Sequence, residues 1–410
     1  MSDSSASHHC FTAGIAFIRR EFCAIGAAVR FNSTSRSDIG STPQRDSNLE
    51  LLRILSMLAI IGYHFCTQTA VCSAEDSSVS GCTAMFLGAF GRTGVNSFVI
   101  IGAWFLIDMP FKSMRLIRLY MPCLCYGLTI TSLFVITGHT AKETAFRTLL
   151  RAATPFSSSP LWFVTAYLLL LLLTPFLNVF IHAVSLRKYR ILNWILLIVF
   201  VFIPTVENIL PGFGVYKYYL IRSDVYWILA LYLLVGYWKR YPGLWIEQGN
   251  RAFACLFGLI LFAAGFCLTS CLLTKYMLPG FAVRKLHACR ESIFYETASA
   301  FCFSTAAAAF FSFRRLHFVS PAVNRISKNL LGIYIIHQIP VFYPVMWGWF
   351  RPETWVNSPW FIPLELATVL LVFTGAWGCD KLGSWLLTPL LNARWLDGLT
   401  KRIDRSVNGN

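Results

Sequence analysis

Ten apolar segments of roughly bilayer-crossing length constrain this chain more than any other feature. A membrane-spanning helix needs about 20 mostly apolar residues. The segments lie near residues 50–70, 85–107, 119–138, 161–183, 191–206, 225–238, 252–274, 293–313, 329–348 and 361–388. Hydrophobic residues make up 56% of the chain and charged residues only 13%, which excludes an ordinary soluble globule. The sequence therefore predicts an all-α, polytopic transmembrane helical bundle.

The basic residues predict how this bundle is oriented. A formal net charge of +16 would suggest a nucleic-acid partner in a soluble protein. Here the lysines and arginines form short clusters between the apolar segments, and they fall about twice as often on the side that holds the termini. We therefore expect no nucleic-acid binding, both termini in the cytoplasm, and a multi-pass protein of the cell inner (plasma) membrane.

The chain is expected to have one membrane domain with two cytoplasmic ends. Residues 1–47 are predicted to be an N-terminal cytoplasmic extension that is partly amphipathic or disordered. Residues 48–391 form the membrane domain, and residues 392–410 form a short basic cytoplasmic tail. No internal repeat is visible, so any chemistry falls to the membrane bundle.

The first segment carries an arginine and a histidine within an otherwise apolar helix. Arg53 and His64 are about three helical turns apart, so their side chains share one face, about 16 Å apart along the axis. Titratable side chains at membrane depth are costly and mostly face a bundle interior or a wet cavity. This pattern favours a functional site. The alternative is that Arg53 pairs with Glu50 or snorkels to the surface, while His64 caps the other helix end near water.

A second basic group begins the third segment. Arg115 and Arg118 lie three residues apart, on one face of a helix that starts at the predicted cytoplasmic surface. Guanidinium groups bind phosphates well, and Arg53 enters the membrane from the same side. Three arginines around one cytoplasmic mouth are what an acyl-CoA donor requires. Taken alone, Arg115 and Arg118 also fit ordinary positive-inside charge.

Other residues in the apolar segments are secondary site candidates. His337 lies about midway along the ninth segment, where it either belongs to a site or simply bonds a neighbouring helix. Trp162 begins the fourth segment, as an interfacial belt residue or as the lining of a sugar site. Glu291, Glu296 and Glu365 lie toward outer span ends, where they either orient a polar acceptor or sit among lipid headgroups.

The cysteines predict neither a metal site nor redox chemistry. Most of the thirteen lie inside apolar segments, where they pack as small apolar side chains. No metal-ligand cluster, nucleotide-binding glycine motif or serine elbow is visible, so we expect no metal and no permanently bound cofactor. Cys72 and Cys82 both lie in the first outer loop, and a disulfide between them is a hypothesis.

Several of these pieces resemble the membrane-bound acyltransferase 3 family and occur in that family's order. The most specific piece is the first-segment pattern Asn48-x4-Arg53-x10-His64. The supporting pieces are the stretch 94–102, Arg115-x-x-Arg118, Leu161–Trp162–Phe163, and the stretch from Leu331 to His337. One departure is Gly102, which follows Ile101 where the family usually has a serine. The chain resembles the short form of the family, without an extracytoplasmic esterase-like domain.

The resemblance implies a bacterial integral-membrane O-acyltransferase of the cell envelope. It implies that His64 is the catalytic histidine and that Arg53, Arg115 and Arg118 help to hold acyl-CoA, expected to be acetyl-CoA, as the donor substrate. The acceptor would be a hydroxyl of a cell-surface glycan or of a lipid-linked sugar. His64 would either deprotonate this hydroxyl or accept the acyl group itself, and both routes need a neutral imidazole.

Two other classes of function remain open from the residues alone. Ten spans with intramembrane charges also suit a transporter or flippase for a polysaccharide or its lipid-linked precursor. That class does not explain why arginines gather at one mouth. A membrane sensor or scaffold would leave Arg53 and His64 dispensable.

Overall fold

The computed structural model describes residues 46–69, 71, 78–140, 142–154, 161–209, 223–276, 286 and 290–408. This part of the chain is helical and contains no strand, which confirms the all-α prediction. The helices are α2 (Asn48–Gln68), α3 (Val79–Gly88), α4 (Gly91–Leu106), α5 (Ser113–Ile136), α6 (Lys142–Ala153), α7 (Trp162–Ala183), α8 (Leu186–Leu197), η4 (Ile198–Phe202), α9 (Ile203–Ile209), α10 (Asp224–Arg240), η5 (Trp245–Glu247), α11 (Arg251–Tyr276), η6 (Glu291–Tyr295), α13 (Ala300–Arg314), α14 (Pro321–Ile326), η7 (Ser327–Asn329), α15 (Leu330–His337), α16 (Tyr343–Phe350), η8 (Pro352–Thr354), α17 (Phe361–Leu391) and α18 (Arg394–Asn408).

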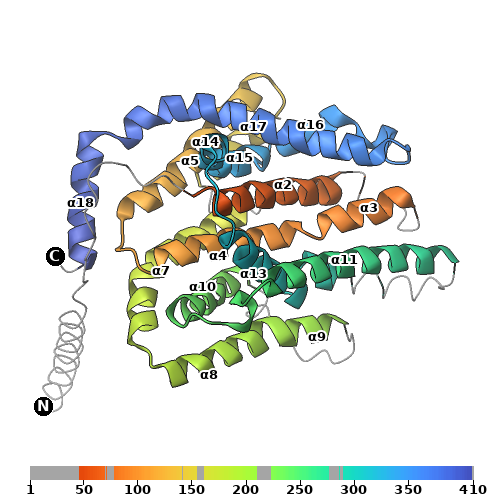
Figure 1. Cartoon of the computed structure of the whole chain (residues 1–410). Helices are drawn as coiled ribbons and strands as arrows, with labels where there is room; N and C mark the ends of the chain where they lie inside the picture. Colours follow the sequence, from red (N-terminus) through yellow and green to blue (C-terminus); the bar gives the residue numbers. More distant parts are fainter. Residues whose placement is uncertain are drawn as a thin grey trace, which may run out of the picture.

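Seven helices in the described part are long and apolar enough to cross a membrane, and they coincide with seven of the predicted segments. They are α2, the joined α3 and α4, α5, α7, the run from α8 into α9, α11 and α17. Many of them lie side by side in Figure 1. The other three predicted segments hold the shorter helices α10, α13 and the α15–α16 pair. The count of ten spans and the cytoplasmic placement of both termini remain predictions.

Two of these segments are interrupted for local reasons. α15 ends at His337 and α16 begins only at Tyr343, because Pro340 lacks an amide hydrogen and disfavours a helical residue before it. In the eighth segment, the Ser299 hydroxyl accepts a hydrogen bond from the Cys302 amide at 3.1 Å and caps the start of α13. The segments near 293–313 and 329–348 are therefore not continuous helices.

The centre of the bundle is formed by α2 and α4. In the most apolar 18-residue stretch of each candidate span, 56% of α2 and 72% of α3–α4 is buried, whereas only 17% of α11 is buried. Gly94 allows the close approach of the two helices, since a Cβ atom there would lie 2.6 Å from the Ser56 carbonyl oxygen. The side-chain amide of Asn48 holds the start of α2 by donating to the Leu316 carbonyl at 2.7 Å. Three polar residues of α2, Asn48, Glu50 and Ser56, are buried in the bundle.

Some predictions fall outside the described residues. Residues 1–45, which make up nearly all of the predicted N-terminal extension, belong to this group, and so does Cys72. Cys82 is a free thiol in the structure. The predicted basic tail begins with a helix, α18, which runs across the ends of the long helices in Figure 1.

Candidate functional site

Two histidines from different helices meet inside the bundle. His64 Nδ1 on α2 lies 3.0 Å from His337 Nε2 on α15, and the two ring centroids are 5.2 Å apart. His337 is fully buried, with 0% of its surface exposed, whereas His64 is only half-buried. His64 is therefore the member of the pair that a reactant can reach, and His337 supports it from behind.

The hydrogen bonds of His337 determine the position of its proton. His337 Nδ1 lies 2.7 Å from the carbonyl oxygen of Ile333, which can only accept. The proton of a neutral His337 is therefore on Nδ1, and its Nε2 is an acceptor. A hydrogen bond between the two rings then requires His64 Nδ1 to donate to His337, and this tautomer leaves a lone pair on His64 Nε2. A general base or a nucleophile needs such a lone pair.

Gln338 favours the opposite protonation state of His64 Nδ1. Its side-chain nitrogen lies 2.9 Å from His64 Nδ1. Trp347 Nε1 donates to the Gln68 oxygen at 3.0 Å, and the Gln68 nitrogen donates to the Gln338 oxygen at 3.3 Å. This chain makes Gln338 a donor, which requires an unprotonated Nδ1 on His64. Two neutral tautomers are thus supported, and only the one that donates to His337 has a basic Nε2.

A cavity of about 240 Å³ follows the face of α2 that leads to this pair. Arg53 and Ile60 line the cavity, and His64 comes one helical turn after Ile60. Tyr334 lines it from α15, and its ring centroid is 6.0 Å from that of His337. Neither histidine lines the cavity itself. The pair lies one helical turn beyond the part of α2 that does.

Arg53 is held by an acidic neighbour while it lines the cavity. Its Nη1 lies 3.0 Å from Glu50 Oε1, and only 4% of the Glu50 side chain is exposed. The ion pair that the sequence left open as an alternative does form, yet Arg53 remains a cavity residue. Lys328 in η7 lines the same cavity. The sequence analysis missed Lys328 because it looks like an ordinary charge in a cytoplasmic loop.

The other two predicted arginines are placed differently from each other. Arg115 Nη1 donates to the Pro110 carbonyl at 2.9 Å. Tyr167, which lines the cavity from α7, interacts electrostatically with both Arg53 and Arg115. Arg118 is exposed on α5 and does not line the cavity. Of the three predicted arginines, Arg53 alone lines this cavity, and it shares the cavity with Tyr167, a residue that the sequence analysis did not single out.

Next to His64 in the chain, Tyr63 forms part of an aromatic pair around Arg92. The guanidinium carbon of Arg92 lies 5.3 Å from the ring centroid of Tyr63 and 5.5 Å from that of Trp162. The buried Nε atom of Arg92 has no hydrogen-bond partner among the described residues. The exposed Glu296 interacts electrostatically with Arg92. Two secondary candidates, Trp162 and Glu296, therefore gather around a cation that the sequence left unassigned.

The remaining acidic candidates lie in different surroundings. Glu365 is fully buried on α17, and the Cys66 thiol donates to its Oε1 at 3.3 Å. Its Oε2 has no hydrogen-bond partner among the described residues, so this side chain is inside the bundle rather than among headgroups. The side chain of Glu291 lies outside the described residues. Within the described part, no group of three or more His, Cys, Asp and Glu residues could hold a metal ion.

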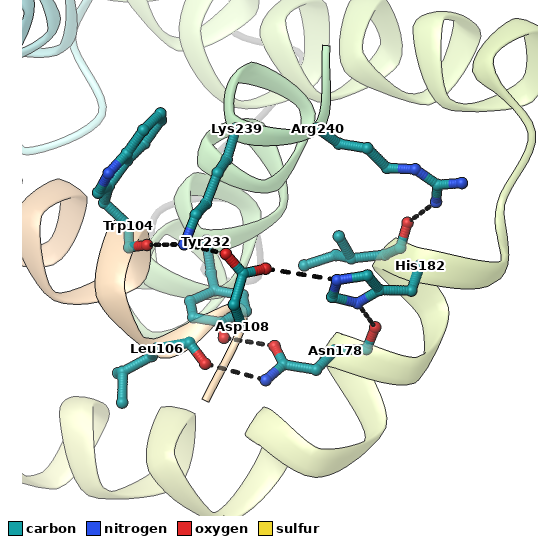
Figure 2. Close-up of polar contacts among 9 residues, drawn as sticks. Trp104, Leu106, Asp108, Asn178, His182, Tyr232, Lys239 and Arg240 are labelled. Carbon is teal, nitrogen blue, oxygen red and sulfur yellow. Dashed lines mark hydrogen bonds and ion pairs between the residues drawn. The ribbon is translucent and has the colours of Figure 1, made fainter. Parts of the chain in front are cut away.

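A polar network ties together the ends of α4, α7 and α10. Figure 2 shows the Asp108 carboxylate, just after α4, between Lys239 of α10 and His182 of α7. His182 Nε2 lies 3.4 Å from Asp108 Oδ1, and Lys239 also donates to the Trp104 carbonyl at 2.5 Å. Asn178 of α7 donates to the carbonyl that ends α4 at 3.0 Å. These groups satisfy one another, and they hold α4, which forms one wall of the cavity.

The fold and the site define a multi-spanning helical membrane protein with a titratable pair inside its bundle. The family model of acyltransferase 3, described as an acyltransferase domain, matches residues 46–378. The chain belongs to the acyltransferase 3 family, since this match covers most of its length. It is accordingly a membrane acyltransferase. A search of curated proteins and a search of solved structures each gave no match.

Proposed function

We propose that this protein is an O-acyltransferase of the cell inner membrane. It would move an acyl group, expected to be acetyl, from cytoplasmic acyl-CoA to a hydroxyl of a cell-surface glycan or lipid-linked sugar. The family supplies acyl transfer as the reaction class. The roles proposed for individual residues are supported by one face of α2. On this face Arg53 and Ile60 line a cavity, and His64 lies one helical turn after Ile60. This one face of α2 therefore carries both an arginine that can bind the phosphates of the donor and a histidine that can act as the base.

The size of the cavity suggests how the donor binds. Its volume of about 240 Å³ is below the ~300–1,000 Å³ of most small-molecule pockets, so a whole acyl-CoA does not fit. The thin acyl-bearing arm would enter, and the nucleotide phosphates would stay outside near Arg53 and Lys328, where charge-assisted hydrogen bonds are strong. Arg115 and Arg118 would meet the donor on its approach.

The transfer step uses His64 as the base. The acceptor hydroxyl attacks the thioester carbonyl carbon while His64 Nε2 takes its proton, and the new ester forms as the carbon–sulfur bond breaks. The imidazolium then returns the proton to the leaving CoA thiolate. In the alternative route, Nε2 attacks the thioester carbonyl carbon first and the CoA thiolate leaves, which gives an acyl-imidazolium. The acceptor hydroxyl then attacks this acyl group, the carbon–nitrogen bond breaks, and the hydroxyl proton passes to the CoA thiolate. Both routes require the tautomer in which His64 donates to His337.

The Arg92 cluster suits the acceptor. Tyr63 and Trp162 offer ring faces, and the Arg92 Nε–H is a buried donor without a partner in the described part. A sugar presents apolar faces and hydroxyl acceptors of matching kinds. Since Tyr63 is adjacent to His64 in the chain, a sugar held here would have a hydroxyl close to the base.

Thermal unfolding of the purified protein with and without CoA tests this proposal against the flippase alternative. A polysaccharide flippase has no use for CoA, so a CoA-dependent rise in Tm that Arg53→Ala abolishes supports the transferase. The control is Arg187→Ala, which removes an exposed charge at the start of α8 and should keep the rise. Failure of several acyl-CoA species to shift Tm at millimolar concentration would favour transport.

A further inference from the structure

The C-terminal helix α18 has an apolar face that the bundle leaves uncovered. Trp395, Leu399, Ile403 and Val407 recur every four residues, and 65%, 48%, 41% and 43% of their respective surfaces are exposed. At 100° per residue they fall within an arc of about 120°. Contiguous exposed apolar side chains of this kind mark an interaction surface.

The opposite face of α18 is basic. By the same geometry, Arg394, Lys401 and Arg405 lie opposite the apolar arc, and Arg402 borders it next to Trp395. All four basic residues are exposed. An apolar face, a flanking tryptophan and a basic face together are the pattern of a helix that lies in a membrane interface.

The position of α18 brings it to such an interface. α17, one of the candidate spans, ends at Leu391, and α18 begins only three residues later at Arg394. In Figure 1, α18 runs across the ends of the long helices rather than alongside them. A helix that follows a candidate span so closely and crosses the ends of the other spans is placed where an interfacial helix would lie.

The third side of α18 is bonded to the beginning of α5. Asp404 Oδ1 accepts the Ser113 amide hydrogen at 2.7 Å. Asn408 accepts from the Phe111 amide at 3.1 Å and donates to its carbonyl at 3.0 Å. Asp404 also interacts electrostatically with Arg115, two residues into the same helix. The placement of α18 therefore affects the segment that carries Arg115.

We propose that α18 is a binding surface for an anionic lipid leaflet. The face formed by Trp395, Leu399, Ile403 and Val407 inserts among the acyl chains, and Arg394, Arg402 and Arg405 bind phosphate headgroups. Because α18 is bonded to Phe111 and Ser113, binding to the leaflet holds the start of α5 in place. No residue of this surface takes part in the proposed transfer step, but the surface positions the start of the helix that carries Arg115.

Photo-crosslinking of the full-length protein in lipid nanodiscs tests which molecule covers the apolar face. A photoreactive phenylalanine analogue replaces Ile403 or, as the control on the opposite face, Lys401, which is exposed and pairs with Asp397 rather than with a headgroup. Lipid adducts several-fold more abundant at position 403 than at position 401 support the proposal. Adducts at 403 to a second copy of the chain, or equal lipid adducts at both positions, would overturn it.

Hydrogen exchange of the unmodified protein tests the preference for anionic lipid. Peptides covering residues 109–115 and 394–408 should exchange at least threefold more slowly in nanodiscs with phosphatidylglycerol than in phosphatidylcholine alone. The difference should shrink in 1 M salt because charge is screened.

A matched pair of triple variants completes this test. R394Q/R402Q/R405Q should lose the lipid difference, and Lys401 is kept because it pairs with Asp397 at 2.7 Å. R187Q/K188Q/R190Q removes three exposed charges from α8 and should keep the lipid difference. Equal exchange of the unmodified protein in both lipids would overturn anionic recognition.

Discussion

Replacing His337 separates a role in orienting His64 from a role in holding the fold. In His337→Gln, the side-chain oxygen can reach the position of the present Nε2 and accept from His64 Nδ1. In His337→Asn, the shorter amide can keep the bond to the Ile333 carbonyl, now 2.7 Å, but it cannot reach His64. The two variants therefore exchange one hydrogen bond for the other in a site of similar size.

The expected loss follows from the hydrogen bond that is removed. Without an acceptor at 3.0 Å, the half-buried Nδ1–H of His64 is left unpaired or yields to the tautomer that Gln338 favours. A buried donor without a partner costs ~1–3 kcal/mol, which corresponds to a fall in kcat of about 5- to 150-fold. His337 does not line the cavity, so the KM for acyl-CoA should change less than twofold.

The assay is acyl transfer from labelled acyl-CoA in lipid nanodiscs, with Tm measured for each variant. His337→Asn should lose kcat by about this factor while His337→Gln retains most of it, and neither variant should lose more than a few degrees of Tm. If His337→Asn is as active as wild type, or if both variants lose activity and stability together, His337 does not orient His64.

Three further outcomes are expected. Glu50→Gln removes the charged partner that orients Arg53. The KM for acyl-CoA, measured from initial rates, should therefore rise about fivefold, which corresponds to ~1 kcal/mol. An unchanged KM would mean that Arg53 does not bind the donor. Gly94→Ala forces a Cβ atom against the Ser56 backbone and should lower the free energy of unfolding by ~1–3 kcal/mol. Gly375→Ala, the control, has open space around it and should leave the free energy of unfolding unchanged. Equal stability of the two variants would contradict the close contact between α2 and α4. Trp162→Phe weakens the contact with Arg92 (~0.5–2 kcal/mol) and should raise the KM for the acceptor but not for the donor, and the reverse would place the acceptor elsewhere.

The placement of Arg53 and His64 on one helix face could be predicted from the sequence because it depends on a single helix. Their eleven-residue spacing places them on one face whatever the rest of the bundle does. The meeting of His64 with His337 was not accessible in this way. It joins residues 273 positions apart and depends on how α2 packs against α15, which hydropathy does not encode.

The missed residues show the same limit. Lys328 and Tyr167 look like an inside charge and a span residue in the sequence, and only the cavity that they share with Arg53 distinguishes them. The break in the ninth predicted segment could have been predicted from Pro340, which disfavours a helical residue before it. The prediction of one continuous span considered only hydropathy. Arg118 pairs with Arg115 in the sequence, but its side chain is exposed outside the cavity.

The catalytic role of His64 is tested by transfer of label from radiolabelled acetyl-CoA to cell-envelope material, with purified wild type and His64→Ala compared in lipid. We expect label to enter a glycan fraction with wild type. His64→Ala, folded by the criterion of unchanged Tm, should transfer at least a hundredfold less. Transfer by His64→Ala at the wild-type rate would contradict the role of His64. No transfer by folded wild type with any of several acyl-CoA donors would contradict the proposed function.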